Sequence, residues 1–80
     1  MKFKVGDYFY PNILECVKTE EDKFIKFCIK NENKKIKITG ISVQSKYPIR
    51  SADYDWKLKE IISVKEYEFK QELKKILNDL

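Results

Sequence analysis

The stretch FKVGDYFYPNILECVKTEEDKFIKFCIKNENKKIKITGISVQ, residues 3–44, decides which fold the sequence predicts. Short apolar runs alternate with lysine in this stretch, and polar turn signals at 19–22 and 31–34 separate them. Alternation with a period of two residues is typical of strands that bury one face. We therefore expect four strands, which begin at Tyr8 and then cover 13–18, 23–30 and 35–44.

The last of these strands contains an irregularity at Gly40. Ile36 and Ile38 share one parity, whereas Ile41 and Val43 share the other. A strand that continued straight would turn one of these pairs away from the core, so a bulge or sharp bend at Gly40 is expected. Bends of this kind let a small sheet curl and close.

A fifth strand is predicted over residues 54–62. Large apolar residues, Trp56 among them, alternate there with charged ones. The alternative is a helix over 52–62 with Ser51 as its cap. The alternation favours the strand.

The pattern becomes helical at Ser63. Ser63 and Glu66 fit the capping box Ser-x-x-Glu, in which the serine side chain accepts a bond from the third backbone amide of the helix. This predicts a helix over 63–79. Its apolar stripe consists of five residues, Phe69, Leu73, Ile76, Leu77 and Leu80.

Five strands followed by one helix predict a mainly β protein in which residues 1–80 form a single domain. Three features resemble the small SH3-like β-barrel proteins encoded by bacteriophages and mobile elements: the opening Val5-Gly6-Asp7-Tyr8, the bend at Gly40 and the strand Tyr54-x-Trp56-x-Leu58. The resemblance covers residues 3–64. It implies a five-stranded SH3-like barrel over 3–62 with one C-terminal α-helix over 63–79.

The 80 residues carry a formal charge of +4, from 17 Lys and Arg against 13 Asp and Glu. A mild positive charge attracts nucleic acid or acidic protein surfaces, but it is also common in solubilised domains. No stretch approaches the roughly 20 apolar residues of a membrane span, and the chain does not open with an apolar leader. The expected location is therefore the cytoplasm, that of the host cell if the chain is phage-encoded.

Residues suited to catalysis are scarce. The sequence has no histidine, which is the commonest general base and metal ligand near neutral pH. Cys16 and Cys28 fall on predicted adjacent strands at positions that do not face each other, which predicts free thiols and no disulfide. Two thiols without further ligands do not make a zinc site. We therefore expect a protein that is not an enzyme and has no metal and no cofactor.

A basic hairpin is predicted over residues 24–37, with its strands paired antiparallel across the turn at 31–34. Its outward face and tip hold one aromatic ring and five lysines: Phe24, Lys26, Lys30, Lys34, Lys35 and Lys37. Like charges across paired strands are mildly destabilising, and an anionic partner would offset this. An exposed Phe beside lysines is also suited to stacking on bases. The alternatives are an acidic protein surface as partner and a lysine-rich face that contacts only solvent.

A second candidate surface is aromatic. In an SH3-like barrel the first strand, the long loop and the last strand lie near one another, which would bring together Tyr8, Tyr10, Tyr47, Tyr54 and Trp56. Such a group can form a peptide groove or a cation-binding cage. Packing of Trp56 in the core, with the tyrosines partly exposed, explains the same residues.

The expected function is that of a non-enzymatic macromolecule-binding module that acts through protein–protein contact. The resemblance to phage-encoded barrels implies a more specific form, a small protein that binds and inhibits a host defence factor. The alternative is nucleic-acid binding through the basic hairpin 24–37. The C-terminal helix either covers an open end of the barrel or pairs with a second copy of the chain or with another protein.

Overall fold

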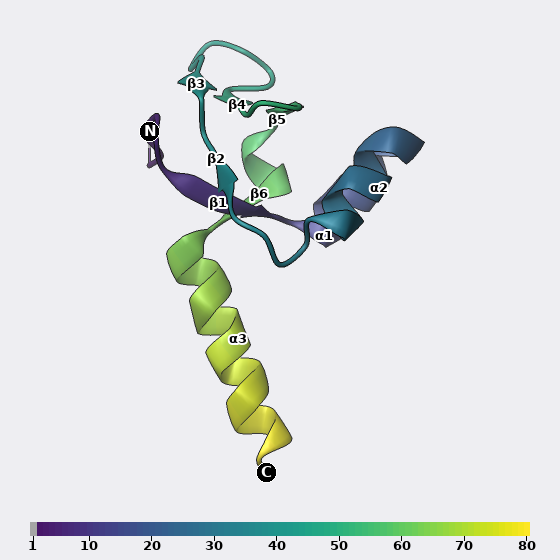
Figure 1. Cartoon of the computed structure of the whole chain (residues 1–80), viewed down its shortest axis with the longest axis vertical. Helices are drawn as coiled ribbons and strands as arrows, with labels where there is room; N and C mark the ends of the chain where they lie inside the picture. Colours follow the sequence, from purple (N-terminus) through teal and green to yellow (C-terminus); the bar gives the residue numbers. More distant parts are fainter. Residues whose placement is uncertain (1) are drawn as a thin grey trace.

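The computed structural model of the chain describes residues 2–80. This part of the chain contains both helices and short strands (Figure 1). In chain order the elements are β1 (Tyr8–Pro11), α1 (Ile13–Cys16), the 3₁₀ turn η1 (Val17–Thr19), α2 (Asp22–Lys30), β2 (Ile36–Lys37), β3 (Gly40–Ile41), β4 (Ile49–Arg50), β5 (Asp55–Trp56), the 3₁₀ turn η2 (Leu58–Glu60), β6 (Ile61–Ser63) and α3 (Val64–Asn78).

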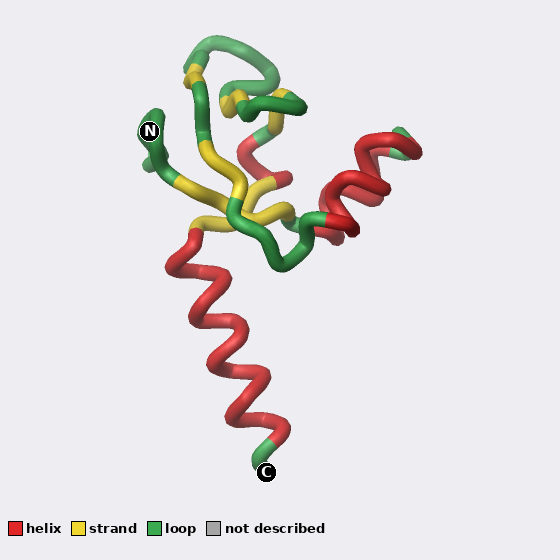
Figure 2. The backbone as a smooth tube through the Cα atoms, in the orientation of Figure 1, coloured by secondary structure: helices red, strands yellow, loops and turns green. Residues whose placement is uncertain are grey.

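The strands form two small antiparallel sheets, each of three strands, over the described residues (Figure 2). In the first sheet β1 is central, and it pairs with β2 on one side and β6 on the other. In the second sheet β4 is central, between β3 and β5. The expected five-stranded barrel with one helix is therefore wrong: the protein is mixed α and β, with no closed barrel.

The stretch 23–30, predicted as a strand, is the helix α2. Its sequence satisfies both periods, because Phe24 and Cys28 are four residues apart as well as of equal parity. In the helix these two side chains are buried together, and Phe27 is half-buried beside them. A helix satisfies its own backbone hydrogen bonds, whereas a strand here would need paired neighbours. The helical period was therefore the correct one.

The strand predicted over 13–18 is also wrong, and the strand predicted over 54–62 is right only in part. Residues 13–18 form α1 and η1, which bury Cys16 and leave Leu14 exposed. Residues 54–62 hold neither one strand nor one helix but β5, η2 and β6 in succession. The interruption is η2, where the Lys57 amide donates to the Glu60 carboxylate at 2.8 Å and so begins a tight turn. Glu60 is thereby buried with its charge hydrogen-bonded.

The irregularity predicted at Gly40 lies where the chain passes from one sheet to the other. β2 ends at Lys37, and β3 begins at Gly40. Between them, the Ile38 amide donates to the Asp7 carbonyl and the Thr39 amide donates to the Arg50 carbonyl, both at 2.8 Å. Because these two bonds lead to different sheets, the apolar residues on either side change parity here.

The core lies between the two sheets and the pair α1–α2. Trp56 is its centre, with no exposed surface. The indole ring packs edge-on to Phe9 at 5.1 Å between ring centroids and lies 4.9 Å from Phe24. Its N–H donates to the Ser51 hydroxyl at 2.9 Å, which satisfies the one polar group of the ring.

The predicted C-terminal helix is confirmed as α3. The Ser63 hydroxyl accepts a hydrogen bond from the Glu66 amide at 3.1 Å, which is the serine half of the predicted capping box. The Glu66 carboxylate pairs with Lys70 instead of returning a bond to Ser63. Figures 1 and 2 show α3 leading away from the two sheets, with the C-terminus at its far end. The molecule is correspondingly elongated, with principal extents of 44 × 28 × 17 Å.

Two aliphatic residues provide a matched test of where the core lies. Ile49 has no exposed surface, whereas Val43 is 70% exposed. Ile49→Ala should lower the free energy of unfolding by about 2–5 kcal/mol, because it leaves a cavity. Val43→Ala should change it by no more than about 0.5 kcal/mol. Urea unfolding followed by tryptophan fluorescence measures both, and equal losses would contradict this core.

Candidate functional site

The apolar face of α3 is the most prominent feature of the surface. It comprises the five residues of the predicted stripe, and all of them are exposed. The exposed fraction ranges from 43% at Leu73 to 95% at Leu80. Soluble proteins rarely leave several large apolar side chains together in water unless they bind something there. The apolar face of α3 is therefore a candidate contact surface.

The body of the protein touches α3 only near its first two turns. The Tyr67 ring stacks on Tyr10 with 3.7 Å between centroids, and its hydroxyl donates to the Asn33 side chain. Every residue of the chain after Tyr67 is exposed. The expectation that the C-terminal helix covers an open end of the barrel is therefore wrong. The apolar stripe points into solvent.

Charged residues border the apolar face on both sides. From the helical spacing, Lys70 and Lys74 lie along one edge. Glu68, Glu72 and Asp79 lie along the other. The Lys70 ammonium also pairs with the Glu66 carboxylate at 3.2 Å within the helix. A partner that covers the apolar face thus meets a basic edge and an acidic edge.

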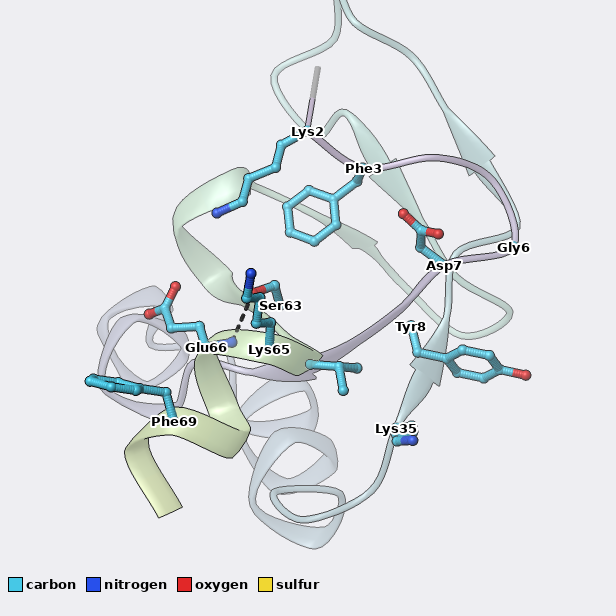
Figure 3. Close-up of a pocket in the computed structure, with 11 residues that line it drawn as sticks. Lys2, Phe3, Gly6, Asp7, Tyr8, Lys35, Ser63, Lys65, Glu66 and Phe69 are labelled. Carbon is cyan, nitrogen blue, oxygen red and sulfur yellow. Dashed lines mark hydrogen bonds between the residues drawn. The ribbon is translucent and has the colours of Figure 1, made fainter. Parts of the chain in front are cut away.

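An open hollow of about 830 Å³ adjoins the start of α3 (Figure 3). Phe69, the first residue of the apolar face, lines it, so the hollow and the face are continuous. Figure 3 shows the side chains of Lys2 and Phe3 above Ser63 and Glu66, with Phe69 near the edge. The full lining is Lys2, Phe3, Gly6, Asp7, Tyr8, Lys35, Ser63, Val64, Lys65, Glu66 and Phe69.

The residues of the predicted basic hairpin are not on a hairpin. Lys26 and Lys30 lie on α2, and Lys34, Lys35 and Lys37 follow it in the turn and β2. All five lysines are exposed, as expected. Phe24, in contrast, is only 5% exposed and packs between Tyr54 and Trp56, so its predicted exposure is wrong. The helix turns Phe24 inward because its apolar side faces the core.

The five residues of the predicted aromatic group do not form one surface. Trp56 is core, and Tyr54 is half-buried against Phe24 at 5.2 Å between ring centroids. Tyr47 is exposed and has the Lys57 ammonium 5.5 Å from its ring centroid. Tyr8 and Tyr10 lie on β1, where Tyr10 is buried and Tyr8 is exposed. The alternative explanation from the sequence, that Trp56 packs in the core, agrees with the structure.

Cys16 and Cys28 lie next to each other, although the predicted strands placed them at positions that do not face each other. α1 packs against α2, and Cys16 and Cys28 are both fully buried free thiols. Interaction with the neighbouring Cys28 thiol, together with burial, raises the pKa of Cys16 far above its ordinary value. The Cys16 thiol donates its hydrogen bond to the Glu60 carbonyl at 3.6 Å. Such a thiol stays protonated and unreactive at neutral pH.

Two kinds of feature are absent from residues 2–80, which the structure describes. No group of three or more His, Cys, Asp or Glu side chains is placed to hold a metal ion. None of the helices in these residues combines the length and the apolar character that a membrane crossing requires. Comparison with family models, with curated proteins and with solved structures finds no match for the chain. The functional proposals therefore rest on the surfaces described above.

The exposure of α3 predicts how a substitution on its apolar face affects folding. Leu73→Ala should change the free energy of unfolding by no more than about 0.5 kcal/mol, because the side chain has few contacts to lose. Chemical denaturation of the isolated protein measures this. A loss of about 2–4 kcal/mol would instead show that α3 docks on the body.

The raised pKa of Cys16 predicts how stability depends on pH. The folded protein keeps the thiol protonated, whereas the unfolded chain releases this proton above about pH 8.5. The contribution of this thiol to the free energy of unfolding is therefore complete at neutral pH. It is lost as the pH rises above about 8.5. Urea unfolding at about pH 7 and pH 9.5 should show a smaller fall in stability for Cys16→Ala than for the wild type. An equal fall in both would contradict the assignment.

Proposed function

We propose that this protein is a non-enzymatic binding module that acts through contact with another protein, and that the apolar face of α3 makes the contact. The observation that carries the proposal is the exposure of four large apolar side chains along α3 and of Leu80 just beyond its end. A helix that lays such a face into an apolar groove is a common mode of recognition between proteins. The partner on this proposal offers an apolar groove about one helix wide.

The energetics of α3 support a partner. Helices of about 15 residues are marginal in water on their own, and the exposed part of α3 has only its cap and one ion pair near its start for support. Burial of apolar surface contributes about 25 cal/mol per Å². Leu73, Ile76 and Leu77 retain large exposed areas from which that contribution can come. Binding would therefore both cover the face and stabilise the helix.

The charges beside the face favour another protein over a second copy of this chain. Phe69, Leu73, Ile76 and Leu80 have the four-three-four spacing of a two-helix seam. In a parallel pair of identical helices the residues that flank this seam would set Lys65 against Lys70. In an antiparallel pair they would set Glu72 against Asp79. Both arrangements oppose like charges, which disfavours self-association.

The hollow beside α3 supports a partner with acidic residues. Its rim carries three lysines and two acids: Lys2, Lys35, Lys65, Asp7 and Glu66. Its lining also includes two half-buried apolar side chains, Phe3 and Val64. A partner segment that continues from the α3 groove into this hollow would bring an apolar side chain with carboxylates around it. Charge complementarity of this kind mainly sets orientation and association rate.

A narrower proposal names the partner's role. On this reading the chain is a small phage or mobile-element protein, and the partner is a host defence factor that it inhibits. The sequence features of residues 3–64 suggest this reading, although the chain does not form the barrel that they implied. The face of α3 supplies the contact that an inhibitor without catalytic residues needs. Because the chain is mildly basic, it would act by occluding or wedging its partner and not by imitating DNA.

The proposal predicts the effect of charges placed on the apolar face. Leu73→Lys with Leu77→Lys should abolish binding to the partner, because both side chains would be desolvated in the groove. A partner captured from cells by the tagged wild type is first purified, and its affinity for each variant is then measured by calorimetry. A loss of at least about 100-fold in Kd, close to 3 kcal/mol, is expected.

The matched control is Gln71→Lys with Asn78→Lys, which adds the same charge to the opposite side of α3. It should bind within about threefold of the wild type. Equal losses in the two double variants would contradict the proposal. Sedimentation analysis of the free protein adds a second check, since a dimer that the Leu73 and Leu77 substitutions dissociate would show that the occupant is a second copy.

A further inference from the structure

The positive charge of the protein is concentrated in one segment. Residues 23–37 contain six lysines and one acid, Glu32, which gives them a formal charge of +5. The whole chain carries +4, so the remaining residues together carry −1. The mild overall charge therefore conceals a strongly basic region, which consists of Lys23, Lys26, Lys30, Lys34, Lys35 and Lys37.

The helix α2 arranges half of this charge on one side. Lys23, Lys26 and Lys30 are spaced three and four residues apart, so they share one face of the helix. We call these three residues the α2 lysine face. The buried residues Phe24 and Cys28 lie on a different face. The core thus holds α2 in place while its lysines extend into solvent.

The lysines of the basic region form no ion pair within residues 2–80, and the carboxylate nearest to them along α2 is Asp22, four residues before Lys26. In the part of the chain that the structure describes, the ion pairs involve Lys18, Lys59 and Lys70, and none involves a lysine of 23–37. All six lysines of the basic region are exposed. Like charges three or four residues apart on a helix are mildly destabilising. An anionic partner would remove this repulsion.

We propose that the basic region 23–37 binds the phosphate backbone of a nucleic-acid duplex, with the α2 lysine face as its centre. This site centres on α2 and shares only Lys35 with the hollow beside α3. It does not depend on the function proposed for the apolar face of α3. A helix about 10–12 Å in diameter matches the width of the major groove of DNA, where phosphates line both sides. Lysines act there as point charges that neutralise phosphates.

The burial of Phe24 determines what kind of nucleic acid fits. Proteins that bind single strands combine cationic residues with exposed aromatic rings on which bases stack. Phe24 lies inside the core, so its ring does not reach a base as the sequence predicted. The six cations are all lysine, which lacks the bidentate fork by which arginine reads guanine. We therefore expect backbone contacts without sequence preference, and duplex at least as well bound as single strand.

The test is the salt dependence of binding to a short labelled DNA duplex, measured by fluorescence anisotropy between about 50 mM and 200 mM salt. Each phosphate contact contributes about −0.9 to the slope of log affinity against log salt. The triple variant Lys23→Gln, Lys26→Gln and Lys30→Gln should therefore reduce the steepness of the slope by about 2.7 and lower the affinity at least tenfold at low salt.

The control removes the same charge from scattered exposed positions, as Lys4→Gln, Lys46→Gln and Lys75→Gln. This variant should keep both the slope and, within about threefold, the affinity of the wild type. Circular dichroism confirms that both variants are folded. Equal losses in the two variants would overturn the proposal, since net charge alone would then explain binding.

The same assay also tests two other classes of partner, an acidic protein and a membrane surface. Tighter binding to polyglutamate than to the duplex would overturn the proposal in favour of an acidic protein. Tighter binding to vesicles of anionic phospholipid would overturn it in favour of a membrane surface. Absence of saturable binding to the duplex at low salt would overturn it outright. A single-stranded oligonucleotide that binds more tightly than the duplex would contradict the assignment of backbone contacts.

Discussion

Burial of Trp56 is the interaction on which the rest of the body depends. Its ring packs on Phe9 from the first sheet and on Phe24 from α2, while Trp56 itself belongs to the second sheet. One side chain therefore contacts three parts of the molecule. Each sheet has only three short strands, and such sheets need an apolar neighbour to be stable. The hydrogen bond from the indole to Ser51 fixes the ring in this position.

The small size of this core explains why two surfaces remain available. A chain of 80 residues buries a smaller share of its surface than a larger domain does. The body uses α1 and α2 to cover Trp56, and α3 packs on the body through the stacking of Tyr67 on Tyr10. The lysines of α2 face outward for the same reason, because Phe24 and Cys28 occupy the side toward the core.

The sequence predicted best where the controlling interaction is local. The cap at Ser63 needs only Glu66 three residues later, and the helix begins there as expected. The stretch 23–30 was predicted wrongly because its apolar residues fit a period of two and a helical period equally well. In the candidate site, the lysines were identified but their arrangement was not. Phe24 was assigned to the surface only because a strand would have placed it there.

The sequence by itself determined the charge, the lack of histidine, the helix cap and the apolar stripe of α3, since each is a property of single residues or near neighbours. Only the tertiary structure decided which apolar faces are covered. It buried Phe24, brought Cys16 beside Cys28 and left Leu73 in solvent. Burial depends on contacts between residues far apart in the chain, and a pattern that fits two periods is resolved by those contacts alone.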